Sequence, residues 1–272
     1  MEQAIHVLRK ASSRDQRPVL SSPQKPHDKE RNMSTQKPTV VLVHGAFAES
    51  ASWSGVVKQL QDQSIDVVAV ANPLRSLPGD AAYVRDIIAT ITGPVVLVGH
   101  SYGGMVTTEA ASGNDKVAAL VYVCAFAPEQ DESAFELSTK FPGSTLGQAL
   151  NVYPVATGSN EFAIRPDAFH DQFAADVPAA QAAVMGATQR PVTEVALSTG
   201  LPTSTPAWKT IPSWFVFGDR DLNIPVALHR FLADRAGAKS VREIAGASHA
   251  LSVSQPHAVA ASIMEAVEAV AD

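Results

Sequence analysis

Six short runs of mostly β-branched and aliphatic residues, spaced along the chain after Pro38, constrain its fold more than any other feature. Within most of them hydrophobic residues follow one another without polar alternation, which is typical of strands buried on both faces of a parallel sheet. The runs are Thr39–Val43, Ile65–Val70, Val95–Val98, Val117–Val123, Trp214–Phe217 and, as the weakest, Val241–Ile244.

Longer segments with helical periodicity separate these runs. Four of them have apolar residues spaced on one helical face, and the first three also begin with a serine, an aspartate or a proline, which is typical of helices. They are Ser52–Gln61, Asp80–Thr90, Pro225–Ala236 and Ala258–Val270. Strand alternating with helix predicts an α/β fold, with a mostly parallel, doubly wound sheet of about six strands.

The segment Ala127–Pro212 interrupts this alternation, because it contains no convincing strand and carries several prolines. An insertion of this length is too long for a bare loop. We therefore expect a helical cap at residues 128–210, inserted after the middle strand over the carboxyl edge of the sheet, on a core formed by residues 38–127 and 211–272. Most of its phenylalanines are expected to hold the cap in place: Phe135, Phe141, Phe162, Phe169 and Phe173.

Residues 1–37 differ from the rest of the chain. They are largely polar, contain three prolines and lack apolar periodicity, which predicts a disordered N-terminal tail. Met33 stands shortly before the first strand and is our candidate for the natural start. Because the tail has no apolar central run followed by a small-residue cleavage site, we expect a cytoplasmic protein.

Charge and composition exclude several function classes. The net charge is −6 and no long Lys/Arg cluster lies in the body of the chain, so we expect no nucleic-acid partner. No apolar stretch is long enough to span a membrane. The single cysteine, Cys124, excludes an internal disulfide and a cysteine-based zinc site, and no His/Asp/Glu cluster has ligand spacing. We therefore expect neither a metal nor another cofactor.

The run Val95–Val98 leads directly into Gly99-His100-Ser101-Tyr102-Gly103, which a helical pattern follows. This G-x-S-x-G motif between a strand and a helix is typical of a nucleophile elbow, in which a sharp turn lifts the serine above the sheet edge. Glycines are needed because strand and helix approach too closely there for a Cβ. We predict that Ser101 is the nucleophile.

A tetrahedral oxyanion needs two hydrogen-bond donors. The N–H of Tyr102, directly after the nucleophile, can supply one, and the loop after the first strand can supply the other, for which Ala46 is the best candidate. His44 also lies in that loop, but we expect it to brace the backbone and take no part in the chemistry.

The base follows by elimination among eight histidines. The base should follow the nucleophile and the acid along the chain, on a loop. Histidines in the tail, upstream of the acid, in the cap or inside a helix are therefore set aside, and His229 is one of those inside a helix. His249 remains, on the loop between the final strand and the final helix. The acid should lie on the loop after Trp214–Phe217, where Asp219 and Asp221 both qualify. A loop after the middle strand offers three further carboxylates: Glu129, Asp131 and Glu132.

Together these residues resemble the α/β-hydrolase superfamily, and more narrowly its small-cap branch of plant methylesterases, hydroxynitrile lyases and similar bacterial esterases. The resemblance covers the chain from about Pro38 onward. It rests on Val43–Ala46 with Trp53, Val98–Ser101 with Gly103–Met105, Ala125–Glu129, Asp221 with Ile224–Pro225, and Gly246–His249. In that branch the acid occupies the position of Asp221, which favours Asp221 over Asp219.

The resemblance also distinguishes ester hydrolysis from other reactions of related enzymes. The lyases are expected to carry a threonine at the position of Gly45 and a lysine at that of Ala250, so this chain lacks the groups that support cyanide elimination. Relatives that hydrolyse haloalkanes or epoxides use an aspartate at the position of Ser101.

We therefore expect a carboxylesterase that forms an acyl-enzyme on a small-molecule ester, with the apolar cap favouring hydrophobic or aryl-containing substrates. Phe47 and Phe126 are expected to contact the substrate. A lactonase with the same triad and a ligand receptor with slow turnover are the alternatives. The sequence is compatible with a homodimer.

Overall fold

The computed structural model describes residues 37–271 and arranges the six predicted runs in one parallel sheet. The strand order is β2-β1-β3-β4-β8-β9, which confirms the predicted α/β class. The strands are β1 (Thr39–Val43), β2 (Val67–Val70), β3 (Val95–His100), β4 (Val117–Val123), β8 (Ser213–Gly218) and β9 (Ser240–Ile244). Strands β3 and β8 continue past their apolar runs, so both reach further toward the carboxyl edge than predicted.

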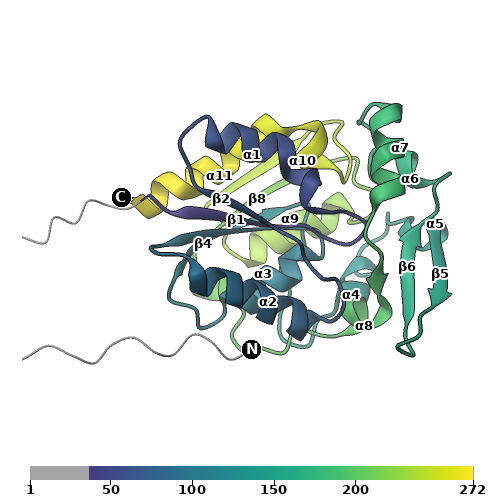
Figure 1. Ribbon diagram of the computed structural model, residues 1–272, viewed down its shortest axis with the longest axis horizontal. Coiled ribbons are helices and arrows are strands. Elements are labelled where there is room, and N and C mark those ends of the chain that lie inside the picture. The colour runs from purple at the N-terminus through teal and green to yellow at the C-terminus, as the bar shows by residue number, and fades with distance from the viewer. Residues whose placement is uncertain (1–36, 272) are drawn as a thin grey trace, which may run out of the picture. The chain divides into compact units, whose positions relative to one another are not determined.

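Helices cover both faces of this sheet (Figure 1). Figure 1 shows α1 and α11 on one face and α2 and α3 on the other. The helices of the core are α1 (Ser54–Gln61), preceded by the 3₁₀ turn η1 (Ser50–Trp53), α2 (Leu77–Thr90), α3 (Gly103–Ala111), α9 (Val226–Arg235), α10 (Leu251–Ser254) and α11 (Pro256–Ala271). The four predicted helices are all present.

For two of the helix starts that differ from the prediction, the structure shows a local contact at the earlier residue. Helix α2 begins three residues before Asp80, because the Ser76 side chain accepts a hydrogen bond from Gly79 N and caps the earlier position. Ahead of α1, Ser52 is part of η1 and donates its hydroxyl to the Glu49 carbonyl, so it does not cap the helix.

The core lies between the sheet and these helices. Strand β3 and the last four residues of β1 are entirely buried, as their uninterrupted apolar sequence requires. Tyr122 of β4 stacks on Phe215 of β8 with ring centroids 4.7 Å apart, which fixes the side-chain layer between these neighbouring strands.

The cap contains helices and also a small antiparallel sheet, so the prediction that it holds no strand is wrong. Its helices are α4 (Ala134–Ser138), α5 (Leu146–Ala149), α6 (Phe169–Phe173), α7 (Ala179–Thr188) and α8 (Glu194–Ser198), with a 3₁₀ turn η2 (Ala207–Lys209) at the return to the core. Its strands are β5 (Leu150–Pro154), β6 (Asn160–Ile164) and β7 (Val192–Thr193), in the order β5-β6-β7.

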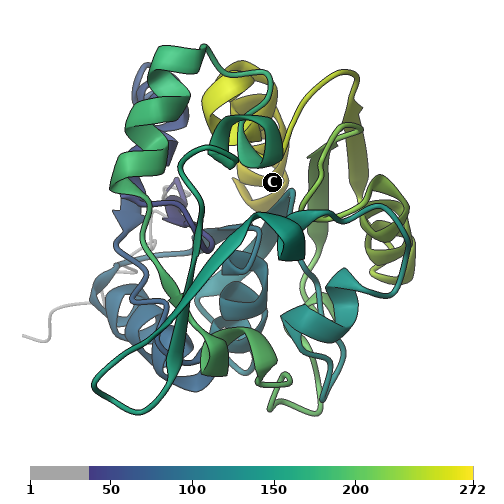
Figure 2. The same cartoon turned by 90° about the vertical axis from the view of Figure 1, so that its right-hand side faces the viewer.

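These strands were missed because they are short and only half apolar. In β6 the buried Phe162 and Ile164 alternate with polar or small residues, whereas β5 is mostly exposed and ends at a proline. Gly158, with a φ of 84°, turns the chain between them. Figure 2 looks onto this side of the molecule, where the hairpin of β5 and β6 and helix α7 lie in front of the sheet.

Arg235 of α9 fastens the beginning of the cap segment to the core. Its guanidinium donates hydrogen bonds to the Ala127 carbonyl and to both carboxylate oxygens of Glu132. It also lies over the rings of Trp208 and Phe231, at 5.5 and 5.2 Å from their centroids.

The predicted tail lies outside the described residues, apart from Lys37. No helix within residues 37–271 combines the length and apolar character that a membrane span requires.

Candidate active site

Ser101 stands at a strained turn between β3 and α3. Its φ is 55°, a left-handed conformation that non-glycine residues seldom adopt outside functional sites. A Cβ on Gly99 would lie 2.7 Å from the Gly103 carbonyl oxygen, and one on Gly103 would collide with the Val43 carbonyl. The strand and helix therefore approach as closely as the elbow motif predicts. Ser101 itself is 8% exposed.

A buried carboxylate anchors the residue after Ser101, a contact that the sequence did not predict. The Tyr102 hydroxyl donates to Asp80 Oδ2 at 2.9 Å, while Asp80 Oδ1 accepts from Arg75 N. Burial raises the pKa of the Asp80 carboxyl. The sequence indicated only that Asp80 begins a helix, because its partner is more than 20 residues away.

The loop after β1 lies directly against this elbow. A Cβ on Gly45 would be 2.6 Å from Ser101 Cβ and 3.1 Å from Tyr102 N. In the described part of the chain, neither Ala46 N nor Tyr102 N donates to a backbone acceptor in turns and loops. Both N–H groups therefore remain candidates for the two donors of an oxyanion site.

His44 braces that loop in the manner expected. Its Nε2 accepts from Asn72 N at 3.1 Å, its Nδ1 donates to the Gly45 carbonyl at 2.9 Å, and Asn72 Nδ2 donates to the His44 carbonyl. Burial lowers the pKa of His44 to about 4, so the ring is neutral at neutral pH and connects two backbone segments by hydrogen bonds.

Asp221 and His249 come together beneath the cap. His249 Nδ1 lies 2.7 Å from Asp221 Oδ2, and both side chains are fully buried. Asp221 Oδ1 accepts two backbone hydrogen bonds, from Asn223 N at 2.8 Å and Ile224 N at 2.9 Å. Although burial opposes it, the neighbouring imidazole of His249 and the second imidazole of His229 hold the pKa of Asp221 well below its usual range.

The His249 loop packs on both the elbow and the cap. His100, immediately before Ser101, donates from Nε2 to the His249 carbonyl at 3.0 Å, and the two rings are 4.8 Å apart. Phe173 of α6 meets the His249 ring edge-on at 5.0 Å. His249 Nε2 has no hydrogen-bond partner among residues 37–271. The predicted hydrogen bond between Ser101 Oγ and this nitrogen is therefore not formed in this structure, and Nε2 keeps a free acceptor position.

His229, which its place in a helix excluded as the base, contacts the same carboxylate as His249. Although it lies inside α9, its Nε2 reaches the same Asp221 Oδ2 at 3.0 Å. No sequence signal identifies it, since a histidine in a helix is ordinarily a core or surface residue and the contact depends on how α9 packs on β8.

The other candidate acids contact other groups. Asp219 Oδ1 accepts from Gly246 N at 2.7 Å near the surface, which braces the loop before His249. Glu129 pairs with Lys209 at 2.6 Å, and Glu132 pairs with Arg235. Asp131 has a φ of 65° and donates its backbone N–H to the Leu201 carbonyl in the cap.

Cys124 joins the buried group at the end of β4. Ligand-type atoms of Cys124, Asp221 and His249 lie within 4.8 Å of one another, a grouping that sequence spacing did not indicate. Burial, together with the Asp221 carboxylate, raises the pKa of the Cys124 thiol well above its usual range. The thiol therefore stays protonated. Asp221 and His249, the other two members of the group, are hydrogen-bonded to each other.

Phe126 and Phe47 are the two residues predicted to contact substrate; Phe126 lies at the elbow, whereas Phe47 lines a cavity. Phe126 N donates to the Ser101 carbonyl at 3.2 Å, so its backbone holds the elbow. Phe47, with a φ of 61°, lines a cavity of about 250 Å³ together with Val184 and Met185 of α7 and Val253 of α10. The cavity lies between the cap and the loop that follows β1.

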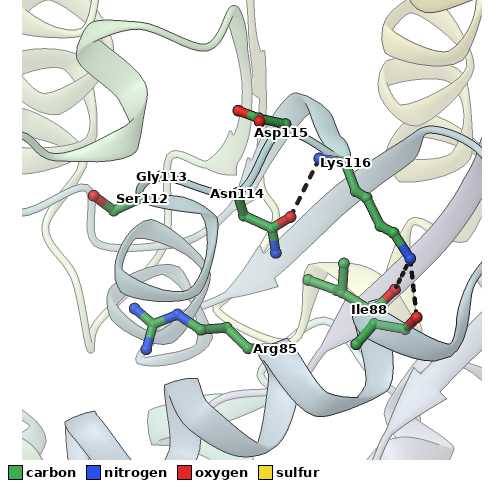
Figure 3. A pocket seen from close by; sticks show the side chains of 8 residues that line it. Arg85, Ile88, Ser112, Gly113, Asn114, Asp115 and Lys116 are labelled. Atoms are coloured by element: carbon green, nitrogen blue, oxygen red, sulfur yellow. Dashed lines mark hydrogen bonds between the residues drawn. The ribbon is translucent and has the colours of Figure 1, made fainter.

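A second cavity, of about 440 Å³, lies at the opposite sheet edge, where β4 begins (Figure 3). Lys116 there donates to the carbonyls of Ala89 and Ile91, which terminates α2. Arg85, which also lines it, pairs with Glu109. These cations are engaged in holding helices, and the cavity is separate from the candidate active site.

Comparison with known proteins identifies a family for the chain. Residues 40–262 match the group described as "Alpha/beta hydrolase family". The pyrethroid hydrolase of Sphingobium wenxiniae is 27% identical over 253 residues, covering 86% of this chain and 89% of that protein. The carbendazim hydrolyzing esterase of a Nocardioides species is 43% identical over 116 residues, 37% of this chain and 47% of that protein. The crystal structure of polyneuridine aldehyde esterase superposes with a TM-score of 0.72 at 21% identity, covering 85% of this chain and 99% of that one.

Proposed function

The chain belongs to the alpha/beta hydrolase family, and on that basis we propose that it hydrolyses carboxylic esters through an acyl-enzyme on Ser101. The observation that carries the proposal is the fully buried hydrogen bond of 2.7 Å between Asp221 and His249, adjacent to a strained serine elbow. Relatives named as a pyrethroid hydrolase and a carbendazim hydrolyzing esterase support ester-type chemistry.

The reaction proceeds in two acyl transfers. Ser101 Oγ attacks the ester carbonyl carbon, and its proton passes to His249 Nε2, which has no hydrogen-bond partner among the described residues, Ser101 included. The oxygen that becomes negative is held by Ala46 N–H and Tyr102 N–H. When the tetrahedral intermediate collapses, the C–O bond to the alcohol breaks and His249 returns the proton to the leaving oxygen.

Water then repeats the sequence on the acyl-enzyme. His249 Nε2 takes a proton from the water as its oxygen bonds to the acyl carbon, and the proton returns to Ser101 Oγ as the acid leaves. Asp221 fixes the tautomer of His249 throughout, because a carboxylate oxygen next to Nδ1 requires the hydrogen on that nitrogen.

Cyanide elimination is disfavoured by packing as well as by residue type. A side chain at position 45 would meet Ser101 Cβ at 2.6 Å, so the threonine of the lyases would displace the elbow. Ala250, at the position of their lysine, is 1% exposed and offers no charge to a departing anion. Ester hydrolysis needs neither group.

The substrate we propose has a hydrophobic or aryl group on one side of the ester. The cavity beside the loop after β1 presents Phe47, Met185 and Val253. Its lining also includes polar side chains such as Gln181 and Gln189, and neither Ser101 nor His249 is part of it. Apolar side chains that line a cavity are typical of sites for small hydrophobic molecules.

The test is a panel of nitrophenyl esters, plain alkyl and aryl esters, and lactones, assayed on the wild type and Ser101→Ala. We expect Ser101→Ala to lose at least about 10³-fold in kcat. The matched control is Ser138→Ala on α4, whose hydroxyl donates to the Phe135 carbonyl, and it should retain full activity. Wild-type turnover by Ser101→Ala would refute the proposal, and turnover of lactones in preference to open esters would redefine the substrate.

A further inference from the structure

Two imidazoles share one oxygen of the Asp221 carboxylate. His249 Nδ1 and His229 Nε2 lie 2.7 and 3.0 Å from Oδ2, and both rings are fully buried. We propose that His229 is a positioning residue, which holds Asp221 in place and sets how strongly that carboxylate stabilises a protonated His249. The inference rests on the proposed function, since it concerns the base of that reaction.

His229 must act as a neutral donor. A carboxylate only accepts hydrogen bonds, so the hydrogen lies on His229 Nε2, and a neutral ring then has none on Nδ1. Nδ1 has no partner among the described residues. The ring stacks on Phe217 of β8 with centroids 4.9 Å apart and planes 12° apart. Burial lowers the pKa of His229, so the ring stays uncharged at neutral pH.

Four donors fix the carboxylate plane. Two backbone N–H groups, from Asn223 and Ile224, bind Oδ1, and the two imidazoles bind Oδ2. Each donor withdraws negative charge from the carboxylate. Asp221 therefore stabilises the imidazolium that forms on His249 less when His229 is present than when it is absent. As a result, the protonated His249 releases its proton more readily.

Loss of His229 has two expected consequences. The carboxylate keeps more charge and stabilises the protonated base, so the base becomes protonated at a higher pH and the acid limb of kcat/KM moves up the pH scale. The carboxylate also loses one of two restraints on Oδ2, so the plateau of kcat/KM falls.

The other ionisable groups around this cluster do not change charge near neutral pH. Burial lowers the pKa of His100 to about 3 and raises that of Cys124 well above its usual range. Glu243 of β9, which faces His229 from the neighbouring strand, is paired with Arg230, and this pairing lowers the pKa of Glu243. The acid limb therefore reports on the base.

The experiment compares pH profiles of kcat/KM for the wild type, His229→Leu and His229→Gln on one nitrophenyl ester. Leucine keeps apolar volume without a donor, whereas glutamine restores an N–H donor to Asp221. We expect His229→Leu to lower the plateau about ten-fold and raise the acid limb by about half a pH unit. His229→Gln should recover most of both effects. Phe217→Leu is the control for packing alone, and it should lower Tm without moving the limb.

A wild-type profile for His229→Leu, or a His229→Gln profile like that of His229→Leu, would overturn the inference. A second measurement needs no variant with a perturbed core: ¹⁵N NMR of the histidine rings in the wild type. We expect His229 to be the neutral tautomer with hydrogen on Nε2 throughout neutral pH. A charged His229, or one with hydrogen on Nδ1, would refute the assignment. The NMR result is independent of whether Ser101→Ala abolishes turnover, so failure of the proposed function is recognised separately.

Discussion

Replacement of Asp221 by asparagine is the perturbation whose consequences the structure specifies most fully. The carboxylate accepts four hydrogen bonds, two on each oxygen, and is fully buried. Asparagine has nearly the same shape but only one acceptor oxygen, and its NH₂ group is a donor. Whichever way the amide lies, its NH₂ faces two groups that also donate.

The cost to catalysis follows from the tautomer. If the NH₂ takes the position of Oδ2, His249 can satisfy it only by accepting at Nδ1, which puts the ring hydrogen on Nε2. That nitrogen then cannot take the proton of Ser101. We expect kcat to fall by on the order of 10⁴-fold, the size of the effect when a triad histidine is held in the wrong tautomer.

The cost to stability in the same orientation follows from His229, whose Nε2–H loses its acceptor. An unsatisfied buried donor costs about 1–3 kcal/mol, so Asp221→Asn should lose about that much. For a domain of this size, each kcal/mol lowers Tm by about 2–4 °C. Both effects are measurable on one preparation, by initial rates on a nitrophenyl ester and by thermal unfolding.

Asp219→Asn is the matched control, because Asp219 was the rival acid and its side chain receives one hydrogen bond, from Gly246 N near the surface. It should stay within about three-fold of the wild type in kcat, since a surface hydrogen bond contributes little. The reasoning is refuted if Asp221→Asn keeps kcat within ten-fold of the wild type, or if Asp219→Asn loses as much.

Two further predictions concern stability. Gly104→Ala would press a Cβ against the Phe126 carbonyl, so it should lower the free energy of unfolding by about 3 kcal/mol or more, as measured by thermal unfolding. Gly147→Ala is the control: its Cβ would have no neighbour within 4 Å, so it should not lower the stability. Although partial burial opposes it, Arg235 holds the pKa of Glu132 below its usual range, so this pair stabilises the fold above the ordinary carboxyl range and ceases to do so as the pH falls through it. Arg235→Met should therefore lower Tm at neutral pH, with the difference from wild type shrinking below about pH 4; a difference that grows on acidification would contradict this.

Much of the core could be predicted because its signals are local. The run Thr39–Val43 matches β1 in full, since an uninterrupted β-branched run has few alternatives to a buried strand. The cap could not be predicted to the same extent. Strand β6 places only Phe162 and Ile164 in the core, and its pairing with β5 and β7 depends on contacts distant in sequence.

In the candidate site, too, residues with a local sequence signal could be predicted and contacts between distant elements could not. Ser101 lies in a contiguous motif, and His249 could be reached by chain order, so sequence reasoning sufficed to nominate both. The hydrogen bonds of His229 to Asp221 and of Tyr102 to Asp80 join different elements and have no local signature. They depend on how helices α9 and α2 pack on the sheet, which only the fold specifies.

Peptide mapping by mass spectrometry after a rapid acid quench of turnover tests the central claim most directly. With a slowly deacylating nitrophenyl ester, the account predicts one acyl group per chain, attached to Ser101, absent from Ser101→Ala and strongly reduced in Asp221→Asn. Steady turnover with no acyl group on Ser101, or with the acyl group on another residue, would contradict it.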